Sequence, residues 1–95
     1  MVNVKRLVWD EWNVDHIARH GVVPKQVEEV CHGDHVMREA YGGRLMIIGH
    51  TKNKKLLAMV LAPKDKDEYY PVTAYTASGK LRRIYHQEKG KEKKL

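Results

Sequence analysis

The stretch from residue 36 to residue 75 constrains the fold more than any other part of the chain. It alternates short apolar runs with polar turns, and the runs are rich in β-branched and aromatic side chains. Runs of this length and composition, separated by turns of a few residues, predict consecutive strands of an antiparallel sheet. The runs that we predict as strands are Val36–Tyr41, Leu45–Ile48, Leu56–Ala62 and Tyr69–Tyr75.

The residues between these runs specify the turns. Gly42-Gly43 is a two-residue hairpin signal, and polar turns follow at Lys52–Lys55 and Lys64–Asp67. Pro71 stands inside the last run, where it has no N–H to donate to a neighbouring strand. We therefore expect that strand to lie at an edge of the sheet or to carry a bulge.

Two short helices are predicted before the sheet. Asp10 is a good N-cap for a helix over Glu11–His20, which Gly21 ends. A second helix starts at Pro24 and stops at Gly33. Helices this short are not stable alone, so both must pack on the sheet.

The helical period returns after the last strand, because Ala77, Leu81, Ile84 and Tyr85 recur at helical spacing. The tail from residue 89 to residue 95 has almost nothing to bury, which predicts disorder. A weak alternation over Val2–Val8 is compatible with a short first strand. The expected fold is α+β, one domain over residues 1–88, with two N-terminal helices and one C-terminal helix on an antiparallel sheet of about four strands.

Size and charge limit the possible functions. The chain has 95 residues, enough for one domain, and a net charge of +6, which favours a polyanionic or an acidic protein partner over a merely solvated surface. Its single cysteine, Cys31, falls on the apolar stripe of the second helix, which indicates a core residue rather than a nucleophile. We see no signal peptide, and the longest apolar stretch, Leu56–Pro63, is too short to span a membrane. These features predict a cytoplasmic protein that does not associate with membranes.

The basic side chains form the most informative set. Arg82 and Arg83 lie on the C-terminal helix close to Tyr85. A guanidinium matches the geometry of phosphate oxygens, and a tyrosine ring can stack on an unpaired base, so this combination favours RNA. The further side chains that we predict to bind RNA are Arg38, Arg44, Lys80 and Tyr75.

The chain has six histidines, and two of them share a helix side. His16 and His20 are four residues apart, a spacing that metal-binding pairs use, but the glutamate of a metalloprotease motif is absent and no cysteine pair accompanies them. We predict no metal site. Histidine is the usual general acid or base in proteins, so any of the six could transfer protons, and the sequence alone does not choose among them.

Both ends of the chain resemble the BrnT family of bacterial toxins. Trp9-Asp10-Glu11 followed by Ala18-Arg19-His20-Gly21 resembles the family opening Trp-Asp-Glu … Lys-His-Gly. Val72-Thr73-Ala74 … Arg82-Arg83 … Tyr85 resembles the family ending Ile-Ser-Ala-Arg … Glu-Arg-Arg-x-Tyr. The resemblance spans about residues 7–87, and the opening is its more specific part.

The resemblance implies a RelE-like α+β fold and an endoribonuclease that inhibits translation by cutting RNA without a metal or another cofactor. It also implies a cognate antitoxin of the ribbon-helix-helix type that forms a complex with the toxin. Arg82 and Arg83 would stabilise the charge that develops on the phosphate, and Tyr85 or His50 would help to move protons.

Two positions depart from the family pattern. Tyr75 stands where the family has an arginine, and Leu81 stands where it has a glutamate. These departures support an alternative, a non-catalytic RNA- or protein-binding module that is a degenerate relative of the toxins.

Overall fold

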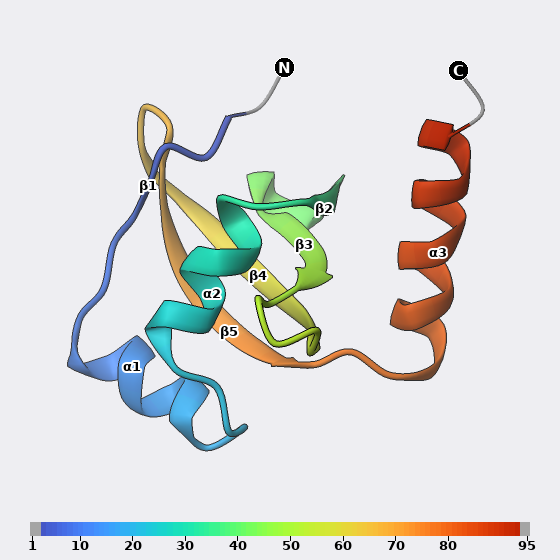
Figure 1. Ribbon diagram of the computed structural model, residues 1–95. Helices are drawn as coiled ribbons and strands as arrows, with labels where there is room; N and C mark the ends of the chain where they lie inside the picture. Colours follow the sequence, from blue (N-terminus) through green and yellow to red (C-terminus); the bar gives the residue numbers. More distant parts are fainter. Residues whose placement is uncertain (1–2, 94–95) are drawn as a thin grey trace.

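The computed structural model describes residues 3–93 of the chain (Figure 1). The elements are β1 (Arg6–Leu7), α1 (Glu11–Ala18), α2 (Pro24–Cys31), β2 (His35–Glu39), β3 (Leu45–His50), β4 (Leu56–Asp65), β5 (Glu68–Thr76) and α3 (Gly79–Lys93), with a 3₁₀ turn at Tyr41–Gly43. The α+β class is as predicted, but the sheet has five strands in the order β1-β5-β4-β3-β2 rather than about four. The fifth strand is β1, which falls within the weak alternation over Val2–Val8 and pairs with β5 in parallel over two residues, whereas an antiparallel sheet was expected.

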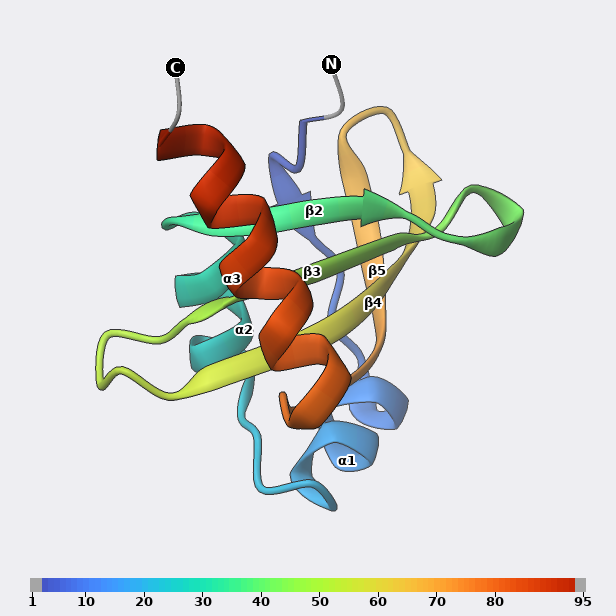
Figure 2. The ribbon, with the colours of Figure 1, turned by 90° about the vertical axis from the view of Figure 1, so that its right-hand side faces the viewer.

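The helices cover opposite faces of the sheet. Figures 1 and 2 show α1 and α2 on one face and α3 alone on the other. The strand register explains this arrangement, because neighbouring residues of a strand point to opposite faces. The row Ile47–Met59–Ala74 belongs to the core cluster that includes Ile17 of α1 and Val27 of α2.

The opposite face carries the alternate residues. The row Ile48–Ala58–Tyr75 packs with Leu81 and Tyr85 of α3. His50 has the same parity as Ile48 along β3, so its side chain also projects toward α3. The fold therefore contains two apolar layers, and α3 completes the second one.

Pro71 lies where the sheet tolerates it, as predicted. The register shifts at this point, with Val60 opposite Thr73 but Leu61 opposite Pro71, which is a bulge. β1 pairs only with Glu68 and Tyr69, so β5 has no partner on that side at Pro71. The missing N–H therefore costs no ladder hydrogen bond.

The Gly42-Gly43 hairpin forms, but its loop is longer than the predicted two residues. Glu39 pairs with Leu45, and the loop is closed by a hydrogen bond from the Ala40 N–H to the Arg44 carbonyl, 2.7 Å. Both glycines have positive φ, 74° and 79°, which glycine adopts without steric cost. The predicted strand over Val36–Tyr41 thus ends two residues early.

The start of α1 uses a capping box that the sequence pattern did not reveal. The Asp10 side chain accepts a hydrogen bond from the Asn13 N–H, and the Asn13 side chain accepts one from the Asp10 N–H. Asn13 is fully buried and also donates to the Val8 carbonyl. The helix ends at Ala18, two residues before the predicted end, and Gly21 follows with φ 75°.

The C-terminal helix is longer than predicted. It continues to Lys93, so residues 89–93 are helical and not part of a disordered tail; the last two residues of that predicted tail lie outside the described residues. Ion pairs hold the helix where apolar contacts end, since Lys89 pairs with Asp34 and Glu88 pairs with Arg38 of β2. Within residues 3–93, no helix has the length and apolar character needed to cross a membrane.

Candidate functional site

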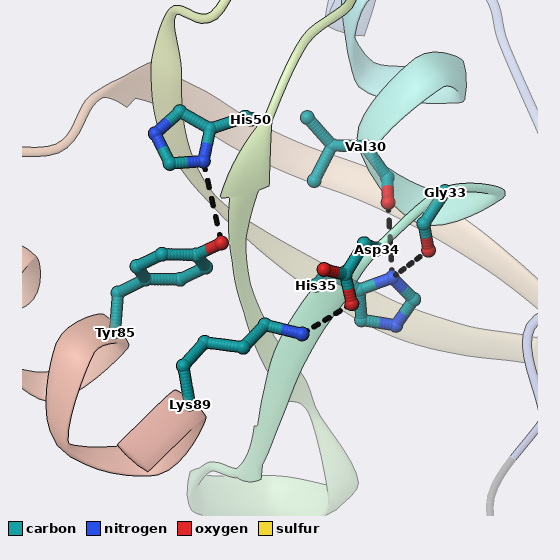
Figure 3. Close-up of polar contacts among 7 residues, drawn as sticks. All are labelled: Val30, Gly33, Asp34, His35, His50, Tyr85 and Lys89. Atoms are coloured by element: carbon teal, nitrogen blue, oxygen red, sulfur yellow. Dashed lines mark hydrogen bonds and ion pairs between the residues drawn. The ribbon is translucent and has the colours of Figure 1, made fainter. Parts of the chain in front are cut away.

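His50 and Tyr85 meet at one end of the sheet, under α3 (Figure 3). The distance between Nδ1 of His50 and the hydroxyl of Tyr85 is 3.3 Å, and the two rings meet edge to face with centroids 5.1 Å apart. His50 is the last residue of β3, and Tyr85 lies in the middle of α3 with 8% of its surface exposed. Two of the four predicted catalytic side chains are therefore in contact.

A hollow opens beside this pair. It has a volume of about 320 Å³ and is lined by Asp34, His50, Thr51, Lys54 and Tyr85. A larger hollow of about 570 Å³ shares Asp34, His50 and Thr51 and extends toward α2. The imidazole of His50 thus stands between two solvent-accessible spaces, and its second ring nitrogen is turned away from Tyr85 (Figure 3).

Asp34 and Lys89 form the second polar contact of the site. The Lys89 ammonium donates a hydrogen bond to the Asp34 carboxylate and lies 6.0 Å from the centroid of the Tyr85 ring. Its hydrogen bond holds the pKa of Asp34 below the usual value, and the positive charge of Lys89 lowers that pKa further. The pair ties α3, one helical turn after Tyr85, to the residue just before β2.

Lys54 is a site residue that the sequence analysis assigned only to a polar turn. It lines the hollow with His50 and adopts φ 67°, a conformation rare for residues with a side chain. The Thr51 carbonyl accepts a hydrogen bond from the Lys54 N–H, and the Thr51 N–H donates to the Lys55 carbonyl, so the turn is well defined. No ion pair neutralises Lys54 within residues 3–93, which leaves a cation at the mouth of the hollow.

The predicted arginines flank the site rather than line it. Arg82 and Arg83 are exposed on α3, and neither forms an ion pair with another described residue. Arg82 is three positions before Tyr85 and therefore lies on the same side of the helix, whereas Arg83 projects elsewhere. Of the two, Arg82 is the better placed to contact a phosphate bound near His50.

The residues predicted to bind RNA are dispersed. Arg38 forms an ion pair with Glu88, and Lys80 is exposed in the first turn of α3. Arg44 precedes β3, so it lies about 20 Å from His50 at the usual strand rise of about 3.4 Å per residue. Tyr75 is half-buried and meets the ring of His20 edge to face, with centroids 6.2 Å apart.

Two other expectations concern Cys31 and metal binding. Cys31 is buried in the core as predicted, with its sulfur 3.5 Å from that of Met59, and burial raises the pKa of its thiol to about 12. Among the described residues, histidine, cysteine, aspartate and glutamate side chains do not gather in any group of three that can hold a metal ion. His16 and His20 instead contact each other edge to face, with centroids 5.6 Å apart.

Comparison with known proteins identifies the fold. No protein-family model matches the chain, and no curated protein sequence matches it. The crystal structure of the Brucella abortus ribonuclease toxin BrnT is similar, with a TM-score of 0.63 and 22% sequence identity over 78% of this chain and 97% of that one. The chain therefore has a BrnT-like fold, in agreement with the resemblance of its two ends.

Proposed function

We propose that this protein is the toxin of a toxin–antitoxin pair and that it cleaves RNA as a metal-independent ribonuclease of the BrnT type, within the RelE-like superfamily. The observation that carries the proposal is the contact between His50 and Tyr85 beside a hollow that also holds Lys54, in a fold shared with a ribonuclease toxin. The net charge of +6 supports a polyanionic substrate. Cleavage of cytoplasmic RNA would inhibit translation.

The geometry supports a reaction through the 2′-hydroxyl of RNA. Tyr85 orients the imidazole through Nδ1, which leaves Nε2 of His50 to accept the 2′-hydroxyl proton. The 2′-oxygen bonds to phosphorus while the bond to the 5′-oxygen breaks, and the 5′-oxygen takes up a proton. The products are a 2′,3′-cyclic phosphate and a 5′-hydroxyl.

Cations around the hollow would stabilise the additional negative charge of the pentavalent phosphate. Lys54 lines the hollow, and Arg82 lies one helical turn before Tyr85. Arg83, Arg38, Arg44 and Lys80 are exposed at dispersed positions outside the hollow, where they would hold RNA away from the reacting centre.

The central experiment is cleavage of RNA by the purified protein in the presence of EDTA. We expect cleavage by the wild-type chain and its loss in the double variant Arg82→Ala, Arg83→Ala. The matched control is the double variant Lys64→Ala, Lys66→Ala. It removes two exposed cations near the end of β4 that is far from His50. Intact RNA with the wild-type protein, or equal losses in both double variants, would contradict the proposal.

The proposal includes a cognate antitoxin of the ribbon-helix-helix type. Expression of the chain alone should arrest growth, and coexpression of a small ribbon-helix-helix protein encoded next to it should restore growth. Normal growth at good expression of the chain alone would argue against a toxin.

A second candidate is a non-catalytic binding module. Tyr75 and Leu81 stand where the family has charged residues. Both pack in the apolar layer between α3 and the sheet. Their positions therefore supply no charge to a substrate. Salt-sensitive RNA binding without any cleavage would favour this candidate.

A further inference from the structure

Four aromatic rings form a continuous row outside the site described above. Trp12 stacks on His16 with centroids 5.0 Å apart and an angle of 6° between the planes. His16 contacts His20, and His20 contacts Tyr75 at the end of β5. The row thus runs along α1 and reaches the strand that leads into α3.

The side chain of Trp12 is not packed in the hydrophobic core. Of the two tryptophans near α1, Trp9 packs against the core, where its indole N–H donates to Glu28 at 2.9 Å. Trp12 is 58% exposed. An indole that stacks on another ring with one face and leaves its other face exposed resembles the platforms on which proteins bind unpaired bases.

A small hollow lies against this ring. Its volume is about 150 Å³, and it is lined by Trp12, Asp15, His16 and Arg19. Asp15 and Arg19 are four residues apart, a spacing at which ion pairs form on helices. Within residues 3–93, however, neither side chain has an ion pair, so both keep their hydrogen-bonding capacity for a ligand.

We infer that this hollow holds one unpaired base of the RNA, with guanine preferred. The base stacks on Trp12, the Asp15 carboxylate accepts hydrogen bonds from the N1–H and the amino group of guanine, and Arg19 faces the adjoining phosphate. Adenine, cytosine and uracil do not offer this pair of adjacent donors. The inference deepens the proposed function, since it concerns the base preference of the RNA that the enzyme would hold.

Charge distinguishes this hollow from the one beside His50 and Lys54. The carboxylates of Glu11 and Asp15 on α1 offset the positive charge of Arg19, the residue that follows the helix, so this surface does not attract phosphates strongly. Its contribution is therefore recognition of a base rather than attraction of the backbone. RNA that enters the hollow can continue along His20 and Tyr75 toward Lys80 at the start of α3.

The test measures binding separately from cleavage. The probe is a seven-nucleotide uridine oligomer, fully 2′-O-methylated so that the 2′-oxygen cannot attack, with guanosine, adenosine or cytidine at the central position. Quenching of tryptophan fluorescence reports stacking on Trp12, and anisotropy of a labelled oligomer gives the affinity. We expect the guanosine oligomer to bind most tightly and to quench the fluorescence.

Three variants give the expected losses. Trp12→Ala should weaken binding about 5- to 150-fold, the range that corresponds to the stacking of one base. Asp15→Asn should remove the guanosine preference, about tenfold, whereas the matched variant Glu39→Gln on β2 should not. Because Trp12 contributes no charge, Trp12→Ala should leave the salt dependence unchanged, whereas Arg82→Ala should reduce it.

The outcomes separate this inference from the proposed function. The inference is overturned, even if RNA is cleaved, when all oligomers bind equally tightly or when the Trp12→Ala variant binds as tightly as the wild type. The exposed Trp12 ring would in that case be assigned to a contact with a protein partner. Guanosine-selective binding without cleavage of unmodified RNA would support the inference and overturn the proposed enzyme.

Discussion

The hydroxyl of Tyr85 allows the proposed chemistry to be tested without disturbing the fold. The ring of Tyr85 is buried beneath α3 in the layer formed by Val36, Ile48 and Ala58, while its hydroxyl reaches Nδ1 of His50 at 3.3 Å. Tyr85→Phe removes only the hydroxyl and keeps the packing of the ring. A change in activity then reports the hydrogen bond to His50.

The expected magnitudes differ for the two partners. A hydrogen bond of this kind contributes about 0.5–1.5 kcal/mol, so Tyr85→Phe should slow cleavage about 2- to 12-fold. Removal of a general base costs about 10²- to 10⁴-fold, which is the loss expected for His50→Gln. His50→Gln combined with Tyr85→Phe should be no slower than His50→Gln alone, because the hydroxyl acts only through the imidazole.

The assay is single-turnover cleavage of an end-labelled RNA with the protein in excess, so that product release does not affect the rate. Urea unfolding of the same variants controls for structure. Tyr85→Phe should lose less than about 1.5 kcal/mol of stability, whereas Tyr85→Ala should lose about 3–5 kcal/mol because it empties the layer under α3. A His50→Gln variant that cleaves within threefold of the wild-type rate would refute the assignment of His50.

Four further predictions concern the framework of the site. Gly49→Ala should destabilise the fold by about 1–3 kcal/mol in urea unfolding, because the new Cβ would lie 2.9 Å from the Asp34 carbonyl oxygen. Asn13→Ala should lower stability by about 1–3 kcal/mol in the same measurement, since it removes a fully buried side chain that bonds the Asp10 N–H and the Val8 carbonyl at the α1 cap. Cys31 should resist a thiol reagent at pH 8 until urea unfolds the chain, because burial raises its pKa to about 12; rapid labelling of the native protein would contradict this. Lys89 lowers the pKa of Asp34 in the folded state, so the ion pair stabilises the fold at pH values above the ordinary pKa of 3.8. This stabilisation disappears as the pH falls below 3.8, because Asp34 then becomes protonated. Plots of unfolding free energy against pH for the wild type and for Asp34→Asn should therefore converge in acid.

Local sequence patterns predict which helices and strands form, but they do not predict the residues at which these elements begin and end. The strand patterns, the glycine turn and the proline bulge all depend on residues close together in sequence, and each lies near its predicted place, although β3 and β4 continue to His50 and Asp65 and the glycine loop is longer than two residues. β1 is different, because the weak alternation over Val2–Val8 is compatible with a short strand but does not show that this strand joins β5 in parallel across the domain. The length of α3 was also underestimated, since the residues that extend it are polar and are held by ion pairs to β2 rather than by an apolar stripe.

The site shows the same division between local pattern and distant contact. The period of two along β3 gives His50 the parity of Ile48, and the helical period gives Tyr85 the buried side of α3; together they imply that both side chains face the same layer. Neither pattern shows at which position along the strands α3 lies. Tertiary contacts set that position, and among them is the one between Lys89 and Asp34, which connects a residue assigned to a tail with a loop residue 55 positions earlier. Local sequence can therefore predict the layer in which a catalytic pair lies, whereas the pairing itself needs the tertiary contact that fixes one element along another.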